Sequence, residues 1–310
     1  MTQPKPLTGV LAPVITPFKA DLSPDPDRLI AHCRWLISQE CGLALFGTNS
    51  EANSLSVDER MMLLEAVVGE GIDPGRMMPG TGCCALSDSV RLTAHAVKLG
   101  CAGVLMLPPF YYKGVSDEGL FRNFAEVIER VGDARLRIYL YHIPSVSQVP
   151  ISLGLIELLL KAYPQAVAGI KDSSGDWNNT KAMLDSLPGW GVFAGNELVL
   201  LANMRGGGVG CISATANVNP AAINRLYREW QSPGAEQMQE EINEVRRFIQ
   251  QFPMIPSLKQ IVAHYHGDPD WIVVRPPLTA LPAEEASALL DGLNERGFAM
   301  PGLETSKGVA

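Results

Sequence analysis

The sequence has no long apolar run and no excess of positive charge. No stretch of its 310 residues reaches the roughly 18 consecutive apolar residues that a membrane-spanning helix needs. Pro13 and Pro17 interrupt the N-terminal apolar segment, which makes it a poor signal peptide. The formal net charge is -8 and basic residues do not cluster, which argues against nucleic acid as a partner. We therefore expect a cytoplasmic protein that binds neither membranes nor nucleic acid. The negative net charge does not exclude small anionic ligands.

Metal and redox motifs are also missing. The six cysteines show no CxxC spacing, although Cys83 and Cys84 are adjacent, and we expect all six to be reduced thiols. Neither GxSxG nor HExxH occurs. The segment 80–85 fits GxGxxA, but no acidic residue ends the following strand, which disfavours a dinucleotide site and with it an NAD-dependent oxidoreductase. His264 and His266 form an HxH pair with no third ligand in view. We expect no metal and no cofactor.

Eight short apolar segments recur along the chain. Most are continuous rather than alternating, which is typical of parallel strands covered on both faces. They span residues 10–18, 43–50, 77–83, 103–110, 136–144, 166–174, 191–197 and 208–217. Helical stretches lie between them, and their expected starts include Asp27, the capping box Ser56–Glu59, Ser87, Ser116, Ser152, Asp176 and Asn219, with a short helix over 197–205. This repeat predicts an α/β fold, a (β/α)8 TIM barrel, with a doubly wound sheet as the alternative.

The pattern changes after residue 230. Residues 239–251, 256–265 and 283–297 are predicted to be helices with no strand between them. We therefore expect the barrel over residues 1–230, C-terminal helices packed on it over 231–300, and a tail over 301–310.

A barrel of this kind builds its site at the carboxyl ends of the strands. The residues at those ends are Thr16, Thr48, Asn49, Ser50, Glu51, Gly80 to Gly82, Tyr111, Tyr112, Tyr141, His142, Lys171, Asp172, Asn196, Glu197 and Ser213. Lys171 is exceptional, because it lies inside an apolar strand in a chain with few lysines. A buried amine is either paired, with Asp172 or another strand-end acid, or serves as a nucleophile for a carbonyl substrate. Tyr141 is either a proton donor beside such an amine or a core tyrosine.

Five motifs, in this order, resemble the dihydrodipicolinate synthase / N-acetylneuraminate lyase family. They are GTNSE (47–51), PPFYYKGVSDEGL (108–120), YHIP (141–144), GIKDSSGD (169–176) and GGGVGCISATAN (206–217). The resemblance covers roughly residues 8 to 280. It implies a class I aldolase or lyase that forms a Schiff base with pyruvate or a related 2-oxo acid and works with an aldehyde. It also implies a homo-oligomer, a dimer or tetramer.

The resemblance also implies residue roles. Lys171 would form the imine and Tyr141 would be the general acid and base, with Thr48 linking Tyr141 into a proton relay. Thr48 and Asn49 would bind the substrate carboxylate through their N–H groups. Tyr112 matches the aromatic residue that enters the neighbouring subunit's site. Further substrate contacts would come from Ile212, Ser213, His142 and Glu197, although His142 could instead simply pack.

Two departures from the family pattern bear on the substrate. Val146 stands where the synthase branch has an arginine for the second carboxylate of aspartate semialdehyde, and valine cannot bind a carboxylate. Leu198 replaces one acid of the pair found in the sialic-acid branch, which leaves Glu197. We therefore expect an aldolase of the 4-hydroxy-2-oxoglutarate or 2-oxo-3-deoxy sugar acid type. The alternatives are a dehydratase or deaminase acting on the same imine, a 4-hydroxy-tetrahydrodipicolinate synthase, and a non-catalytic ligand-binding barrel.

Overall fold

A computed structural model describes residues 7–303 of the chain, and these residues form two units. The first unit contains residues 73–212 with the segment before residue 10, and the second contains residues 10–72 and 213–303. Each unit is built from parallel strands that alternate with helices. Within residues 7–303, no helix combines the length and the apolar character that crossing a membrane requires.

The first unit contains most of the sheet. Its strands are β3 (Val104–Met106), β4 (Ile138–His142), β5 (Val167–Asp172), β6 (Gly191–Ala194) and β7 (Gly210–Ile212). They lie in sequence order and pair in parallel throughout. A parallel bridge between Gly80 and Leu105 adds the expected segment 77–83 next to β3. The order never reverses in this unit, whereas a doubly wound sheet has a switch point.

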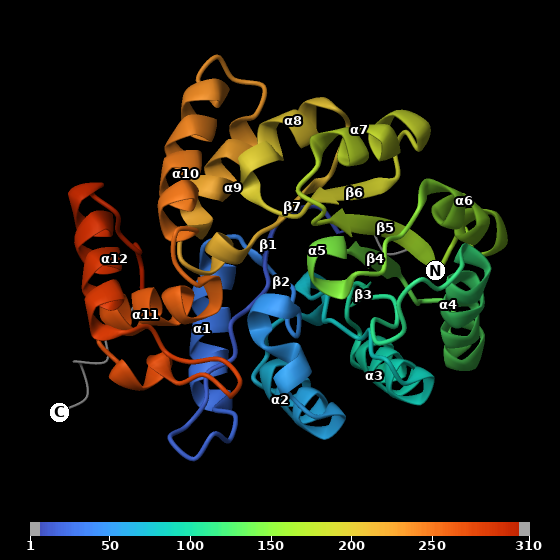
Figure 1. Ribbon diagram of the computed structural model, residues 1–310, viewed down its shortest axis with the longest axis horizontal. Coiled ribbons are helices and arrows are strands. Elements are labelled where there is room, and N and C mark those ends of the chain that lie inside the picture. The colour runs from blue at the N-terminus through green and yellow to red at the C-terminus, as the bar shows by residue number, and fades with distance from the viewer. Residues whose placement is uncertain (1–6, 304–310) are drawn as a thin grey trace. The chain divides into compact units, whose positions relative to one another are not determined.

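The helices of the first unit are η3 (Pro74–Arg76), α3 (Leu86–Leu99), α4 (Asp117–Val131), α5 (Pro144–Ser147), α6 (Leu153–Ala162), α7 (Trp177–Ser186), η4 (Glu197–Val199) and α8 (Leu200–Arg205). Of these, α3, α4, α6, α7 and α8 lie on the outer side of the strands, whereas the short α5 directly follows β4 (Figure 1). The predicted N-caps Ser116, Ser152 and Asp176 are confirmed, since each side chain accepts a backbone N–H of the first turn. The predicted start at Ser87 is one residue late, because α3 begins at Leu86 after Ala85, which offers no capping side chain.

Glycines make room for one large ring inside the sheet of the first unit. Tyr139 of β4 is paired in register with Gly169 of β5, which in turn is paired with Gly191 of β6. A methyl group on Gly169 would lie 2.7 Å from the Tyr139 ring, and one on Gly103 would be equally close. Tyr139 is fully buried and its hydroxyl accepts the backbone N–H of Leu7. The Tyr139 ring therefore fills one layer of the interior, where a longer side chain at either glycine would clash.

The second unit contains the remaining strands and the C-terminal helices. Its strands are β1 (Gly9–Ala12) and β2 (Gly42–Leu43), which pair in parallel. Its helices are α1 (Pro26–Ser38), η1 (Thr48–Ser50), η2 (Ala52–Ser54), α2 (Val57–Gly69), η5 (Ala214–Asn217), α9 (Pro220–Glu229), α10 (Ala235–Ile249), α11 (Met254–His266), η6 (Pro269–Ile272) and α12 (Ala283–Glu295). The three C-terminal helices predicted from the sequence are thus α10, α11 and α12.

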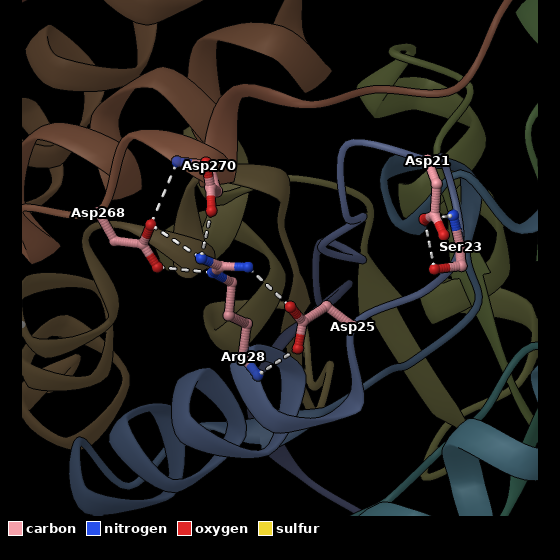
Figure 2. Close-up of polar contacts among 6 residues, drawn as sticks. All are labelled: Asp21, Ser23, Asp25, Arg28, Asp268 and Asp270. Carbon is pink, nitrogen blue, oxygen red and sulfur yellow. Dashed lines mark hydrogen bonds and ion pairs between the residues drawn. The ribbon is translucent and has the colours of Figure 1, made fainter.

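Ion pairs and hydrogen bonds join the C-terminal segment to residues 10–72 within the second unit. Arg28 of α1 binds Asp25 and reaches Asp268 and Asp270 at the start of η6 (Figure 2). These carboxylates, Asp268 first, raise the pKa of the Arg28 guanidinium. The Trp35 indole N–H donates to the carbonyl of Pro301 at 3.0 Å. The boundary at residue 230 stays a prediction, and residues 304–310 of the predicted tail lie outside the described residues.

The predicted capping box of α2 is confirmed and has a further partner. The Ser56 N–H donates to the Glu59 carboxylate at 2.8 Å, and the Glu59 N–H donates back to the Ser56 hydroxyl at 3.2 Å. Arg275 donates to both oxygens of the same carboxylate. Its guanidinium is the main reason why the pKa of Glu59 falls from 4.5 to about 2.

This depressed pKa predicts how acid weakens the fold. The folded state holds Glu59 ionised, so the stabilisation is complete above pH 4.5 and is lost as the pH falls toward about 2. We expect Glu59→Gln to lower the free energy of unfolding by about 1–2 kcal/mol at pH 7, since the partly exposed pair is screened by water. The variant should also lose less stability than the parent between pH 5 and pH 3, measured by urea denaturation. If the free energies of unfolding of the two proteins fell equally with pH, this account would be contradicted.

Candidate active site

Lys171 and Tyr141 face each other on neighbouring strands of the first unit. β4 and β5 pair Tyr141 directly with Lys171, so their side chains point to the same face of the sheet. The Lys171 Nζ donates to the Tyr141 hydroxyl at 3.3 Å and lies 4.4 Å from the centre of its ring. Each residue is only 2% exposed. The structure thus brings together the two residues that the sequence singled out, a primary amine and a phenol, away from bulk water.

Asp172 points away from Lys171. Consecutive residues of a strand alternate between faces, so Asp172 faces the covering helix α7. Its carboxylate accepts hydrogen bonds from the Thr180 hydroxyl at 2.6 Å, the Asn179 amide at 3.1 Å and the Ser174 N–H at 3.0 Å. This carboxylate holds the start of α7 in place. The alternative in which Lys171 is merely the ion-pair partner of Asp172 is therefore wrong.

His142 lies on the same outer face as Asp172. It is paired in register with Asp172 and follows Tyr141, so its ring points away from the amine of Lys171. Its Nδ1 accepts the backbone N–H of Ile151 at 3.0 Å. Burial lowers the pKa of His142, and the nearby Asp172 opposes this only in part. This geometry favours the packing alternative for His142 over a contact with substrate.

Phe193 and Ile212 lie on the same face of the sheet as Lys171. Phe193 of β6 is paired in register with Lys171 on the side opposite Tyr141, and it is fully buried. Gly210 pairs with Phe193, so Ile212, two residues further along β7, faces the same side one layer beyond. Glu197 is buried in η4, directly after β6, where Asn196 caps the turn by accepting the N–H of Leu198. A buried amine in such surroundings is suited to attack a carbonyl carbon.

Thr48 and Asn49 begin a tight turn in the second unit. Both belong to η1, in which Ser50 and Glu51 donate their N–H groups to Gly47 and Thr48. The Ser50 hydroxyl accepts the N–H of Gly47 at 3.1 Å. The first N–H groups of any helix lie outside its own hydrogen bonding, and such groups bind anions. This local geometry is compatible with the predicted carboxylate-binding role.

Ser213 is fully buried at the start of η5 in the second unit. Its hydroxyl lies 3.4 Å from the Thr215 hydroxyl. Arg246 of α10 reaches it as well, with Nη1 at 3.5 Å from the Ser213 oxygen. The C-terminal helix α10 thus places a guanidinium next to a predicted site residue.

Tyr112 is exposed beyond the end of β3. Tyr111 and Tyr112 are both more than 70% exposed, and their rings lie edge to face with centres 5.3 Å apart. Lys113 anchors the segment by donating to the carbonyls of Phe110 and Ser147, the latter at 2.8 Å. An anchored segment with two exposed aromatic rings is typical of an interface.

The weaker motifs gain no support. His264 and His266 lie in the last turn of α11, and no cluster of three or more histidine, cysteine or acidic side chains suited to a metal occurs between residues 7 and 303. Gly82 of the GxGxxA segment packs directly on the backbone of Leu107, where an added methyl group would lie 2.3 Å from the Leu107 nitrogen. This close contact explains Gly82 by packing. All six cysteines are free.

With the geometry established, comparisons identify the family. The model of the dihydrodipicolinate synthetase family matches residues 6–295. An uncharacterized DapA-like lyase of Chloroflexus aurantiacus is 32% identical over 292 residues, covering 93% of this chain and 96% of the relative. The chain therefore belongs to the dihydrodipicolinate synthetase family.

Solved structures agree. The crystal structure of dihydrodipicolinate synthase from Agrobacterium tumefaciens has a TM-score of 0.86 and 33% identity, covering 93% of this chain and 99% of that one. The chloride-inhibited dihydrodipicolinate synthase from Acinetobacter baumannii, solved with pyruvate, has a TM-score of 0.83 and 26% identity, covering 94% and 99%. These matches confirm the predicted fold class, a (β/α)8 barrel with C-terminal helices.

The sequence interpretation missed Lys259, a second buried lysine. Its side chain is fully buried in α11 and is paired with Glu51. The prediction placed this segment in a helix, where lysines ordinarily reach solvent, and only its position between apolar neighbours could have indicated burial. Phe193 was also missed, because a phenylalanine in an apolar strand carries no chemical signal.

Proposed function

We propose that this protein is a lyase of the class I aldolase type, which forms a Schiff base between Lys171 and pyruvate or a related 2-oxo acid. The observation that carries the proposal is the buried contact of 3.3 Å between the Lys171 amine and the Tyr141 hydroxyl. Membership of the dihydrodipicolinate synthetase family supports the same reaction type.

The chemistry follows from these two groups. The Lys171 amine attacks the C2 carbonyl of the 2-oxo acid, and loss of one water molecule leaves a protonated imine. Removal of a C3 proton then gives an enamine, which attacks the aldehyde carbon and forms the new C–C bond. Water finally cleaves the imine and releases the product from the amine. Tyr141 is placed to carry protons to and from the oxygen atoms in these steps, and the reverse sequence cleaves the bond.

The remaining roles rest on the family resemblance. Thr48 and Asn49 would bind the substrate carboxylate through N–H groups, and Thr48 would extend the proton relay from Tyr141. Ile212, Ser213 and Glu197 would line the pocket.

Tyr112 would enter the site of a second subunit, which makes the active form a homodimer or homotetramer. Exposure of both tyrosines after β3 supports this part of the proposal. The proposal also includes a cytoplasmic location, which the six free cysteines support.

Val146 bears on whether the aldehyde substrate is anionic, as in the synthase reaction, or neutral. It lies in α5 and is 61% exposed, at the place where the synthase branch has its carboxylate-binding arginine. A valine there leaves an anionic aldehyde without a partner. We therefore favour a neutral aldehyde, from a 4-hydroxy-2-oxoglutarate or 2-oxo-3-deoxy sugar acid type of substrate, or elimination from such an acid. Synthase activity is the second candidate, since the Agrobacterium structure with 33% identity is a synthase.

The first test traps the imine. Incubation with pyruvate and borohydride should add one reduced pyruvate to the chain, and peptide mass spectrometry should place it on Lys171. Lys171→Ala should give no adduct, and Lys181→Ala, which removes an exposed helix lysine, should label like the parent. An unlabelled Lys171 in folded protein would rule out the imine mechanism for pyruvate.

The second test separates proton transfer from imine formation. Tyr141→Phe keeps the ring and removes the hydroxyl, so kcat should fall by about 100-fold or more. Trapping of pyruvate at Lys171 should change by less than about tenfold, because the amine remains in place. An equal loss of both would remove the proton-transfer role from Tyr141.

The third test addresses the aldehyde. Turnover with pyruvate and aspartate semialdehyde should be about 10 to 100-fold below that with the best neutral aldehyde, the range expected for a missing charged hydrogen bond. Val146→Arg should raise the rate with aspartate semialdehyde and leave the neutral aldehyde little changed. Efficient use of aspartate semialdehyde by the parent would establish the synthase instead.

A further inference from the structure

A balanced cluster of four charged side chains lies within the second unit, next to the turn that carries Thr48 and Asn49. Lys259 pairs with Glu51, and both side chains are 0% exposed. Arg275 pairs with Glu59 at the edge of the same cluster. The Lys259–Glu51 pair is closed off from water, whereas the Arg275–Glu59 pair is partly exposed, so the buried charges depend most on each other. Removing one member of such a buried pair is far more damaging than removing both.

Glu51 itself has an unfavourable backbone conformation. Its φ of 54° and ψ of 34° lie in the left-handed region, which is uncommon for residues other than glycine. In this conformation its N–H donates to the carbonyl of Thr48 at 3.1 Å and closes the turn η1. The backbone strain at Glu51 is therefore tied directly to the shape of the turn, and something outside the turn must compensate for it.

The Glu51 carboxylate supplies that compensation. It accepts the backbone N–H of Arg275 at 3.0 Å and is paired with the Lys259 ammonium. Lys259 is itself fixed, because it donates to the carbonyl of Val273 at 2.7 Å and lies 4.5 Å from the centre of the Phe18 ring. The Glu51 carboxylate thus connects the turn both to Lys259 of α11 and to Arg275 in the segment after η6.

The other contacts of the turn and of the residues after it reach backbone carbonyls, among them one from the buried Arg60 guanidinium to Ala52. Thr16 donates its hydroxyl to the carbonyl of Ser50 at 2.7 Å, and Arg275 donates to the carbonyl of Ser54 at 2.6 Å. These are single hydrogen bonds to backbone oxygens, whereas the Lys259 contact is an ion pair in a site without water access. Burial lowers the pKa of Lys259 to about 8, and Glu51 opposes the shift, so the ammonium is still the main form at neutral pH.

We propose that Lys259 is a positioning residue, which acts through Glu51 to hold the Thr48–Ser50 turn in the conformation that binds the carboxylate of the 2-oxo acid. This inference rests on the proposed function and adds to it a residue from the C-terminal helices. It separates two roles of lysine in one chain, since Lys171 would bond to the carbonyl carbon and Lys259 would act on the carboxylate end from a distance.

The experiment compares two carbonyl compounds that differ in the carboxylate. Borohydride trapping at Lys171 is followed as a function of the concentration of pyruvate and, separately, of acetone. The variants are Lys259→Met and the double variant Lys259→Met/Glu51→Gln, which leaves no unpaired charge in the cluster. Arg28→Met is the control, because it removes a different ion-paired cation, one that is only partly buried, from the same unit.

The expected result is a selective loss. Half-maximal labelling by pyruvate should need at least tenfold more ligand in both Lys259 variants, while labelling by acetone should change by less than twofold. With the aldehyde present, KM for pyruvate should rise and kcat should fall by less than threefold. Arg28→Met should label like the parent with both compounds, whatever its thermal stability.

Three outcomes would overturn the inference. Folded variants could label with pyruvate as the parent does, or lose pyruvate and acetone labelling equally, which would be a general effect on the site. Failure of both Lys259 variants to fold would assign the cluster to the fold alone. The proposed function fails separately, since then the parent protein itself would show no pyruvate adduct on Lys171.

Discussion

The parallel pairing of β4 with β5 is the constraint on which the candidate site depends. It sets Tyr141 opposite Lys171 and at the same time turns Asp172 to the other face. A shift of one residue in this register would place Asp172, instead of Lys171, opposite Tyr141 and would turn the amine to the outer face. On the outer face, hydrogen bonds from Asn179 and Thr180 of α7 engage the Asp172 carboxylate, so the covering helix holds this carboxylate away from the amine.

Much of the fold was predictable because its signals are local. Continuous apolar segments and side-chain caps at Ser56, Ser116, Ser152 and Asp176 mark where strands end and helices begin. Boundaries without such signals were less accurate, as at Ala85, and the segment 77–83 forms only a bridge rather than a regular strand. The grouping of the C-terminal helices with residues 10–72 depends on long-range pairs such as Arg28 with Asp268, which no local pattern predicts.

The candidate site was predictable to the extent that its residues are chemically conspicuous. A lysine in an apolar strand is such a signal, and the alternation of strand residues alone could have shown that Asp172 and His142 face away from it. Lys259 was not predictable in this way, because its partner Glu51 is more than 200 positions away in sequence and its burial follows from the packing of α11. Family membership adds the reaction type, which the two side chains alone leave open.

The ring of Tyr139 limits where a substrate can extend in this chain. It occupies the layer directly before Lys171 and Tyr141, and the glycines around it leave no spare volume. In this chain, therefore, the interior offers no room for a substrate on the Tyr139 side of Lys171 and Tyr141. A longer or more polar substrate can extend only toward the loops that follow the strands. In this chain the side chains that follow the strands, such as Val146 in α5, are therefore the ones placed to meet the distal part of a substrate.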